Sequence, residues 1–306
     1  MTSLRGSAKR TSPPVDLAPR EFGRLQEILT AYCGLSLSEE NLARLSRAVE
    51  AGIRRLSLGD VSSYLDVLGA DTGSDGERNR LVEEIANHET YLFREEKQLD
   101  TLASAVLPEV CKLGRQRLNL WSAGCASGEE PLTLGMILLD SPLWNGPLSR
   151  MEVRILGTDI SRRMIRRARE GRYGESAFKG LSASRRRDLQ RRFFDEEGDA
   201  FVPRSELRKL VTYLQLNLLD RDGTSLFGEM DVILCRNVLM YFPAQLRLRV
   251  IQGFYRKLSP RGYLLLGHSE NLLAEDTPFE AQRLIGSLVY RKPAHPPEDL
   301  REEWGG

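Results

Sequence analysis

The sequence predicts an α/β fold in which an all-helical N-terminal domain precedes a largely parallel sheet covered by helices on both faces. Up to Gly114, apolar residues recur at spacings of three and four, the period of an amphipathic helix. After Gly114, continuous apolar runs alternate with helical segments, which is typical of buried parallel strands. Near the C-terminus, two alternating stretches flank Gly286 and predict a terminal antiparallel hairpin.

The N-terminal helical domain is expected over residues 16–93. Its clearest helix should have Ser38 as its N-cap and end at Gly59, because one apolar face runs between them. That face comprises Leu42, Leu45, Val49, Ile53 and Leu56. Further helices are expected at about 60–68, 77–87 and 95–113, with a loop over 69–76.

The second domain is expected over residues 94–292. Its parallel strands are predicted from four apolar runs, at 118–123, 153–159, 230–236 and 262–268. The terminal hairpin should lie within 279–292. Short strand patterns also occur near Phe193, Phe201 and Val211, and they predict a small antiparallel β subdomain inserted at about 193–215.

The remaining segments and the composition limit the function classes. Residues 1–15 are expected to form a disordered basic tail, and residues 293–306 a flexible, proline-rich C-terminal tail. The 44 Lys plus Arg nearly balance the 43 Asp plus Glu, so overall charge favours neither nucleic acid nor membrane binding. Neither a secretory signal nor a run of about eighteen apolar residues occurs, so we expect a cytoplasmic protein without membrane insertion. The scattered cysteines and three histidines predict neither disulfides nor a metal site.

The turn "GCASGEEP" (124–131), between the first strand and the next helix, carries the first chemical signal. It lacks the G-x-G-x-x-G fingerprint and the P-loop lysine, so a phosphate ligand is not expected there. Glu129 and Glu130 would instead suit a ligand with a sulfonium and an ammonium group, such as S-adenosylmethionine. Asp159 ends the next strand, where an acid can accept hydrogen bonds from ribose hydroxyls. Alternatively, both glutamates are first-turn acids stabilised by the helix dipole.

Two asparagines also follow apolar runs, Asn217 in "LNLLD" and Asn237 in "CRNVLMYF". Polar residues at the carboxyl ends of parallel strands line the crevice in which such sheets bind ligands. Their amides could satisfy the edge of an adenine or the amino acid end of the ligand. Loop capping is the alternative role for each of them.

Six segments, taken in order, resemble those of the CheR family of chemotaxis receptor methyltransferases. They are "ETYLFRE" (89–95), "GEEP" (128–131), "LGTDIS" (156–161), "NLLD" (217–220), "CRNVLMYF" (235–242) and "GHSEN" (267–271). The resemblance spans about 16–292. It implies a Rossmann-like sheet that binds S-adenosylmethionine, together with a helical N-terminal domain and a small β subdomain. The implied reaction converts glutamate side chains of chemoreceptors to methyl esters and yields S-adenosylhomocysteine.

The resemblance also implies roles for individual residues. The implied cofactor-binding residues are His88, Thr90, Arg94, Glu130, Asp159, Asn217, Leu218, Arg236 and Asn237. Arg94 and Tyr241 are the implied catalytic residues, with an interdomain salt bridge and core packing as their respective alternatives. Family members commonly have asparagine where this chain has His88, so a structural role is the alternative there. Glu129 would keep the role of a helix-start acid.

The expected partner is the cytoplasmic helical part of a chemoreceptor. The resemblance implies docking through a basic helix, here carrying Arg44, Arg47, Arg54 and Arg55. A solvated helix face is the alternative. The segment "DEEGDAF" (195–201) is short and has one glycine, unlike the glycine-rich loop by which tethered members bind a receptor peptide, so tether-independent action is expected.

Two other functions remain open at this point. The first is a catalytically silent module that binds the cofactor or a partner and regulates a chemosensory pathway. The second is a methyltransferase for a small carboxylic acid. Arg94, Asp159 and Tyr241 favour catalysis over the silent module, and the arginines of the helical domain favour a protein substrate.

Overall fold

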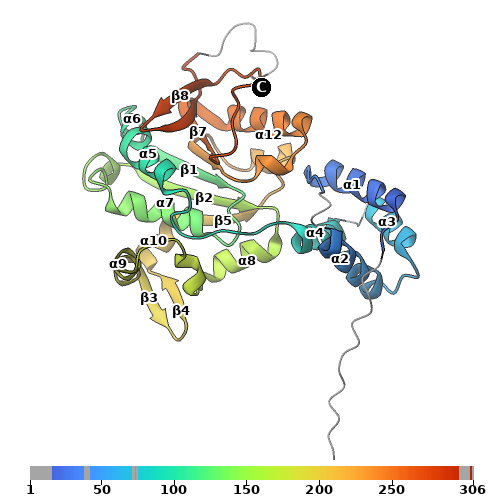
Figure 1. Ribbon diagram of the computed structural model, residues 1–306. Coiled ribbons are helices and arrows are strands. Elements are labelled where there is room, and N and C mark those ends of the chain that lie inside the picture. The colour runs from blue at the N-terminus through green and yellow to red at the C-terminus, as the bar shows by residue number, and fades with distance from the viewer. Residues whose placement is uncertain (1–15, 38–41, 71–72, 74, 296–303, 305–306) are drawn as a thin grey trace, which may run out of the picture. The chain divides into compact units, whose positions relative to one another are not determined.

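The structure is a computed structural model that describes residues 16–37, 42–70, 73, 75–295 and 304 (Figure 1). These residues form two compact units, the first within 16–31 and 37–86, and the second within 32–36 and 87–304. The boundary after residue 86 differs from the predicted one after residue 93, so the "ETYLFRE" segment belongs to the second unit. The expected N-terminal tail and the proposed cap Ser38 lie outside the described residues.

The N-terminal part of the chain is helical, as predicted. Its helices are α1 (Pro19–Cys33), α2 (Leu42–Arg55), α3 (Val61–Gly69) and α4 (Asp75–Ile85). Leu45 and Val49 of the predicted apolar face of α2 are buried. The helix ends at Arg55 rather than at Gly59, since Ser57 has a left-handed φ of 55° that does not continue a helix. Asp60 caps α3, because its carboxylate accepts a hydrogen bond from the Ser63 amide at 2.8 Å.

The second unit alternates helices and strands. Its strands are β1 (Arg117–Ala123), β2 (Glu152–Asp159), β3 (Phe194–Glu197), β4 (Ala200–Pro203), β5 (Val211–Gln215), β6 (Met230–Cys235), β7 (Leu258–Leu266), β8 (Glu280–Leu284) and β9 (Ser287–Arg291). Its helices are α5 (Glu96–Thr101), the π-helical η2 (Leu102–Val106), α6 (Leu107–Cys111), α7 (Glu129–Asp140), α8 (Arg162–Glu170), α9 (Ala183–Phe193), α10 (Ser205–Leu210), α11 (Arg221–Ser225) and α12 (Ala244–Lys257). Short 3₁₀ turns complete it: η3 (Pro147–Arg150), η4 (Glu175–Phe178) and η5 (Leu239–Tyr241).

The main sheet has the strand order β5-β2-β1-β6-β7-β9-β8. The first five of these strands are parallel, and β9 and β8 pair antiparallel, which confirms the predicted parallel sheet with a terminal hairpin. Successive connections run from β1 toward β5 on one side and from β6 toward β7 on the other. The order therefore reverses between β1 and β6, and parallel sheets bind their ligands at such a switch point.

Each face of the sheet has its own apolar core, because side chains alternate along a strand. Leu118 and Leu120 of β1 join a core with α7 and α5, whereas Trp121 and Ala123 join the opposite core with α12. Figure 1 shows α7 and α12 on opposite sides of the sheet. The continuous apolar run "LNLWSA" thus reflects burial on both faces, as the sequence predicted.

The predicted β subdomain is smaller than expected. Its sheet contains only β3 and β4, which pair antiparallel around Gly198. The prediction for Val211 was wrong, because β5 pairs in parallel with β2 at the edge of the main sheet. The expected extent of 193–215 therefore included an edge strand of the main sheet. An edge strand is only partly buried, so its sequence lacks the continuous apolar run of a central strand.

The C-terminal end was also predicted incompletely. Residues 296–303 and 305–306 of the expected flexible tail lie outside the described residues. Trp304 is described, is 1% exposed, and packs edge-on against Tyr255 with the ring centroids 5.7 Å apart. The prediction of a flexible tail is therefore wrong at Trp304, because its aromatic ring is packed. In the described part of the chain, no helix is both long and apolar enough to span a membrane.

Candidate active site

The register of the sheet brings the ends of the parallel strands to one edge. Ala123 at the end of β1 pairs with Thr158, and Asp159 at the end of β2 pairs with Gln215. Cys235 at the end of β6 pairs with Leu266 of β7. The residues that follow these strands therefore lie along the same carboxyl edge, next to the switch point. They include Gly124, Leu216, Arg236 and Gly267, each within or next to a segment of the resemblance.

The turn from β1 to α7 is held by the neighbouring strand. The amides of Gly124 and Cys125 both donate to the Thr158 carbonyl at 2.8 Å. Gly124 and Gly128 have left-handed φ values of 85° and 95°. A Cβ at Gly124 would lie 2.4 Å from Val238 Cγ2. These glycines are thus required by backbone conformation and close packing within the protein, besides any role in letting a ligand approach.

Gly128→Ala is expected to lower the free energy of unfolding by about 2–4 kcal/mol. The left-handed backbone conformation is unfavourable for alanine, and the added methyl group overpacks the site. A Cβ there would lie 2.8 Å from Tyr213 Oη and 2.9 Å from Ala168 Cβ. Gly174→Ala is the matched control, since φ at Gly174 is −89° and nothing lies within 4 Å of an added Cβ. Urea denaturation measures both variants. Equal stability of the two would contradict the packing described for Gly128.

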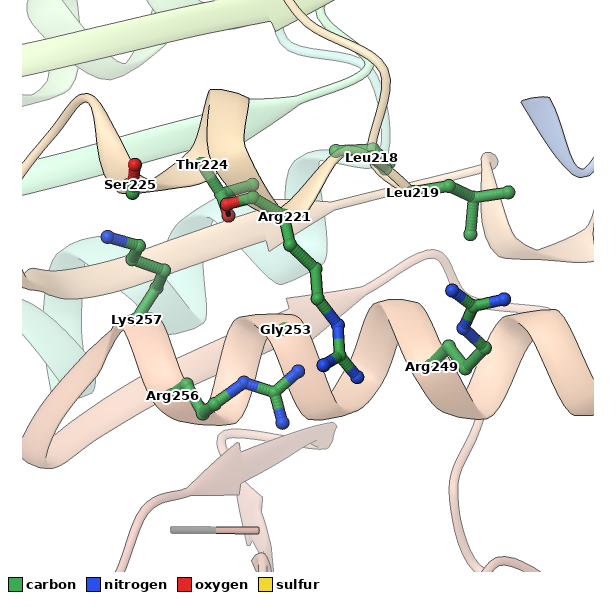
Figure 2. Close-up of a pocket in the computed structure, with 9 residues that line it drawn as sticks. All are labelled: Leu218, Leu219, Arg221, Thr224, Ser225, Arg249, Gly253, Arg256 and Lys257. Carbon is green, nitrogen blue, oxygen red and sulfur yellow. Dashed lines mark hydrogen bonds between the residues drawn. The ribbon is translucent and has the colours of Figure 1, made fainter. Parts of the chain in front are cut away.

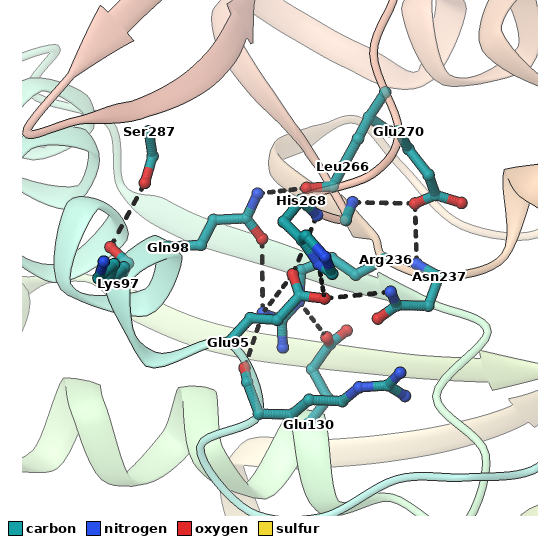
Figure 3. Close-up of polar contacts among 12 residues, drawn as sticks. Glu95, Lys97, Gln98, Glu130, Arg236, Asn237, Leu266, His268, Glu270 and Ser287 are labelled. Atoms are coloured by element: carbon teal, nitrogen blue, oxygen red, sulfur yellow. Dashed lines mark hydrogen bonds and ion pairs between the residues drawn. The ribbon is translucent and has the colours of Figure 1, made fainter.

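Glu130 and Arg236 form a buried ion pair across the switch point (Figure 3). Arg236 Nε donates to Glu130 Oε2 at 2.6 Å, and the Ser122 hydroxyl donates to Glu130 Oε1 at 2.6 Å. Arg236 Nη1 donates to the Arg94 carbonyl at 2.8 Å. The side chain of Arg236 is only 3% exposed. Its guanidinium is thus engaged by protein groups, and it links β6 to α7 and to the "ETYLFRE" segment.

Glu95 joins the next two strand ends into the same network (Figure 3). Its Oε1 accepts hydrogen bonds from Asn237 Nδ2 at 3.0 Å and pairs with His268 Nδ1 at 2.9 Å, while its Oε2 accepts from the His268 amide at 3.1 Å. Burial alone would raise the pKa of Glu95. The hydrogen bonds from His268 and Asn237, together with the charge of Arg236, lower that pKa below its ordinary value of 4.5. Glu95 is therefore ionised at neutral pH and orients Asn237.

The stabilisation by Glu95 is expected to disappear in acid. Since its pKa is lower in the folded state, the ionised carboxylate stabilises the fold above the ordinary value of 4.5 and loses that effect as pH falls through the folded pKa. Glu95→Gln should therefore be less stable than the parent at pH 7, with a gap that narrows below about pH 4.5. Urea denaturation between pH 7 and pH 3 measures it, with Glu196→Gln, exposed on β3, as the control. A gap that does not depend on pH would refute this role.

Glu270 positions the backbone after β6, and sequence reasoning assigned it no role. Its Oε2 accepts from the amides of Asn237 at 2.8 Å and Gly267 at 2.9 Å, and its Oε1 accepts from the Met240 amide at 3.0 Å. It is the acid of the "GHSEN" segment, directly after β7. The signal in the sequence that could have indicated this role was an acid within a motif that follows a predicted strand. Glu270 and Glu95 together hold Asn237 by both its main chain and its side chain.

Asp159 and Glu129 occupy different positions around the glycine turn. Asp159 is 8% exposed, and its two oxygens accept from the amides of Ala126 at 2.9 Å and Ser161 at 2.8 Å. Glu129 begins α7, as the helix-start reading predicted, but it is also buried. Burial raises the pKa of Glu129, which the Ser127 hydroxyl only partly offsets.

The segment that carries Thr90 and Arg94 crosses the same edge. Arg94 lies between Phe93 and Glu95, which have left-handed φ values of 59° and 57°. Ala126 and Asn237 share this conformation, at 47° and 60°. Four non-glycine residues in a disfavoured conformation are thus gathered at this edge, and such strain is common at functional sites. Arg94 Nη1 donates to the Glu89 carbonyl at 2.6 Å, and Thr90 is half-buried nearby in sequence.

Three of the remaining predicted residues, Asn217, Leu218 and Tyr241, are not joined to this network by hydrogen bonds among the described residues. Asn217 follows β5, and its Nδ2 donates to the Tyr32 carbonyl at 2.6 Å while its Oδ1 accepts from the Leu219 amide. The Tyr241 hydroxyl accepts a long hydrogen bond of 3.4 Å from Asn87 Nδ2. Leu218 and His88 are half-buried. Asn217 therefore has the capping role that the sequence left open, besides any ligand contact.

The chemistry available at this edge is electrostatic. All four cysteines are free and buried, and burial raises the pKa of the Cys125 and Cys235 thiols well above the ordinary value of 9.0, so neither thiol ionises near neutral pH. Within the described part of the chain, no group of His, Cys, Asp and Glu side chains could hold a metal ion. The edge offers carboxylates, amides and a guanidinium in their place.

Comparison with known proteins identifies the family. The sequence model described as CheR methyltransferase, SAM binding domain, matches residues 88–284. This chain belongs to the CheR methyltransferase family. A chemotaxis protein methyltransferase of Vibrio parahaemolyticus is 31% identical over 281 residues, and chemotaxis protein methyltransferase 1 of Pseudomonas aeruginosa is 33% identical over 282 residues; each alignment covers 90% of this chain and 98% of the relative. A solved magnesium protoporphyrin IX methyltransferase of Synechocystis with bound S-adenosylmethionine is 14% identical, with a TM-score of 0.32 over 80% of this chain and 94% of that one.

The residues at the carboxyl edge of this CheR methyltransferase suit its cofactor, S-adenosylmethionine. The cofactor has a cationic sulfur, an amino group and a ribose but no phosphate. The turn after β1 correspondingly places Glu129 and Glu130 at the start of α7 and has no lysine. Asp159 is at the strand end where an acid can bind a ribose. The family match and this donor set confirm the predicted cofactor.

Proposed function

We propose that this chain methylates glutamate side chains of chemoreceptors, using S-adenosylmethionine and releasing S-adenosylhomocysteine. The observation that carries the proposal is the coincidence of the family match with the polar edge. Residues 88–284, which match the family, contain Arg94, Glu130, Asp159 and Asn237, and these lie at or beside the switch point of the sheet. The relatives named above are chemotaxis methyltransferases, which supports a chemoreceptor as substrate.

The cofactor, when bound, supplies an electrophilic methyl group on sulfur. A glutamate side chain, with an ordinary pKa near 4.3, is already ionised at neutral pH and needs no general base. The residues of this chain then have to align the receptor carboxylate with the methyl group and exclude water from it. The network around Glu95, Arg236 and Asn237 suits this task, because each of these three residues is held by at least one hydrogen bond or ion pair.

Arg94 is proposed to hold a carboxylate during transfer. A guanidinium is permanently charged and can bind a carboxylate by two parallel hydrogen bonds. Arg94 donates from only one of its terminal nitrogens, to the Glu89 carbonyl, so other donors remain for a ligand. The carboxylate could belong to the cofactor or to the receptor. Tyr241, half-buried and with a hydroxyl held only by the long bond from Asn87, is proposed to lie beside the methyl group.

The function is tested by incubating the protein with methyl-labelled S-adenosylmethionine and chemoreceptor cytoplasmic fragments. We expect label in the receptor that alkali releases as methanol, because esters are alkali-labile. Cofactor binding without transfer would instead support a silent regulatory module. Transfer to small carboxylic acids but not to receptor fragments would identify a different substrate.

The enzyme is further proposed to act without a receptor tether. The β3–β4 hairpin that would bind a tether peptide is closed by a short turn, and Arg172 pairs with Glu197 beside it at 2.5 Å. Fragments with and without their C-terminal peptide should therefore be methylated at similar rates. A strong preference for fragments that retain the peptide, with measurable binding of the isolated peptide in calorimetry, would refute this.

Docking of the receptor is proposed to use Arg44 and Arg47 of α2. Both are exposed and donate to backbone carbonyls, of Ala86 and Ala43, with no carboxylate partner among the described residues. Arg54 instead pairs with Glu50, and Arg55 pairs with Glu77, so the charge of each is already balanced. The two unbalanced arginines are thus better suited to acidic receptor helices than the other two members of the predicted set.

The double substitution Arg44→Ala with Arg47→Ala should raise KM for receptor fragments about fivefold, since two exposed charge pairs contribute roughly 0.5 kcal/mol each. The value of kcat should not change, because both residues are outside the second unit that carries the site. Arg54→Ala, which removes a balanced charge from the same helix, is the control. Steady-state kinetics at low ionic strength measures all three proteins. Unchanged KM in the double variant would exclude these arginines from docking.

A further inference from the structure

A pocket lies between α11 and α12, on the α12 side of the sheet (Figure 2). Its volume is about 280 Å³. Cations dominate its lining, with Arg221 from α11 and Arg249, Arg256 and Lys257 from α12. Leu218 and Leu219 add an apolar wall, and no carboxylate lines it. Four positive charges around a small pocket repel one another, so a bound anion would reduce the electrostatic repulsion among them.

No ion pair balances the positive charge of the pocket among the described residues, although Glu229 acts on Lys257 at longer range. Among the described residues, the guanidinium groups of Arg221, Arg249 and Arg256 make no hydrogen bond and no ion pair. Figure 2 shows Arg221 reaching from α11 toward α12, where its guanidinium lies beside that of Arg256. Burial and the nearby charge of Arg221 lower the pKa of Arg256, and burial lowers that of Lys257, which the charge of Glu229 only partly offsets. Lys257 Nζ donates to the Phe227 carbonyl at 2.9 Å, so the three arginines are the free donors.

The acids near the pocket are used elsewhere or lie outside it. The Asp220 carboxylate accepts from the Gly223 amide at 3.0 Å as the cap of α11, and Asp222 is exposed and does not line the pocket. The hydroxyls of Thr224 and Ser225 donate to carbonyls of α11. Recognition in the pocket therefore depends on three planar guanidinium groups, which bind phosphate oxygens through pairs of hydrogen bonds.

We propose that this pocket binds a phosphorylated small molecule of the nucleotide class. Its phosphates would pair with Arg221, Arg249 and Arg256, and its ring would lie on Leu219. S-adenosylmethionine carries no phosphate, so it is not the ligand for which these charges are suited. The small volume favours a single small molecule over an extended polyanion, whose phosphates would lie largely outside the pocket.

Gly253 provides an uncharged way to block the pocket. It lines the pocket from α12, and nothing lies within 4 Å of a Cβ added there. Gly253→Leu should therefore fill the space without disturbing the helix, in which leucine is favoured over glycine. A second variant, Arg249→Gln with Arg256→Gln, removes two charges and tests whether the arginines bind the phosphates. The matched control is Arg187→Gln, which removes the charge of an exposed arginine of α9 that does not line the pocket.

The test is isothermal titration calorimetry of the full chain with inorganic pyrophosphate, ADP and adenosine, without and with saturating S-adenosylhomocysteine. We expect one molecule of ADP or pyrophosphate per chain, ADP binding more tightly, and adenosine not binding once S-adenosylhomocysteine is present. Gly253→Leu and the double arginine variant should each weaken ADP binding at least tenfold, whereas Arg187→Gln should not change it. Pyrophosphate binding equal to that of ADP would contradict a nucleotide ligand and assign the pocket to phosphate alone.

Several results would overturn the proposal. One is the failure of ADP and pyrophosphate to bind, and another is binding that survives in both pocket variants. Competition of ADP with S-adenosylhomocysteine would place the ligand in the cofactor site instead. Binding of a short single-stranded oligonucleotide that depends on Arg249 and Arg256, without binding of ADP, would assign the surface to nucleic acid. None of these readouts depends on methyl transfer, so the pocket and the proposed function can fail independently.

Discussion

Arg94→Ala is expected to lower kcat for methyl transfer to receptor fragments about a hundredfold or more, the usual effect of removing one preorganised charged donor from a reaction site. Arg94 is held between two residues with left-handed backbone, and its Nη1 is fixed by the Glu89 carbonyl, so its guanidinium is in place before a ligand binds. The labelled-methyl assay under saturating cofactor measures the loss. Tyr241→Phe should have a smaller effect, because the ring remains in place without its hydroxyl.

The control for this result is Arg187→Ala, which removes an exposed arginine of α9 and should leave turnover unchanged. Thermal unfolding of both variants should match that of the parent within a few degrees, since Arg94 makes no ion pair among the described residues. Near-normal turnover of Arg94→Ala would exclude the residue from the site. A large loss of stability would point to a structural role instead.

Arg236→Met is expected to lower the free energy of unfolding by about 3–5 kcal/mol, the cost of leaving a buried charge without its partner. Glu130 would lose a cation at 2.6 Å, the one that pairs with it among the described residues, and Glu95 would lose one at 3.9 Å. Methionine fills a similar volume, so packing changes little. Urea denaturation at pH 7 measures the change.

Two comparisons separate the ion pair from other effects of Arg236→Met. Adding Glu130→Gln to Arg236→Met should recover part of the stability, because the uncompensated carboxylate is then removed. Arg154→Met breaks an exposed pair with Glu152 and should cost at most about 1 kcal/mol. If Arg236→Met were as mild as Arg154→Met, Glu130 and Arg236 would not form the buried pair described.

The order of the apolar runs was sufficient to predict the central sheet. β1, β2, β6 and β7 are buried on both faces, so each appears in the sequence as a continuous apolar run. β5 did not stand out, since an edge strand is partly exposed and its five residues alternate weakly. Its pairing with β2 depends on residues far away in sequence. That is why Val211 was assigned to the inserted subdomain.

The candidate site was predictable in position but not in its internal pairing. The glycine turn indicated Glu129 and Glu130, and strand ends indicated Asp159 and Asn237, whereas the resemblance to the CheR family singled out Glu130. Their partners could not be read from the chain, because Glu130 and Arg236 are 106 positions apart. The resemblance implied a ligand contact for Arg236, and the structure adds that its side chain is held by Glu130 and the Arg94 carbonyl. Glu95 and Glu270 belong to the "ETYLFRE" and "GHSEN" segments, but only the folded chain shows that both hold Asn237.

Peptide mapping by mass spectrometry tests the central claim most directly. A chemoreceptor cytoplasmic fragment is incubated with S-adenosylmethionine and either the parent protein or Arg94→Ala, then digested and sequenced. The proposed function predicts methyl esters on specific glutamates with the parent protein and few or none with the variant. Absence of methylated glutamate with the parent protein, while S-adenosylhomocysteine binds normally in calorimetry, would contradict it.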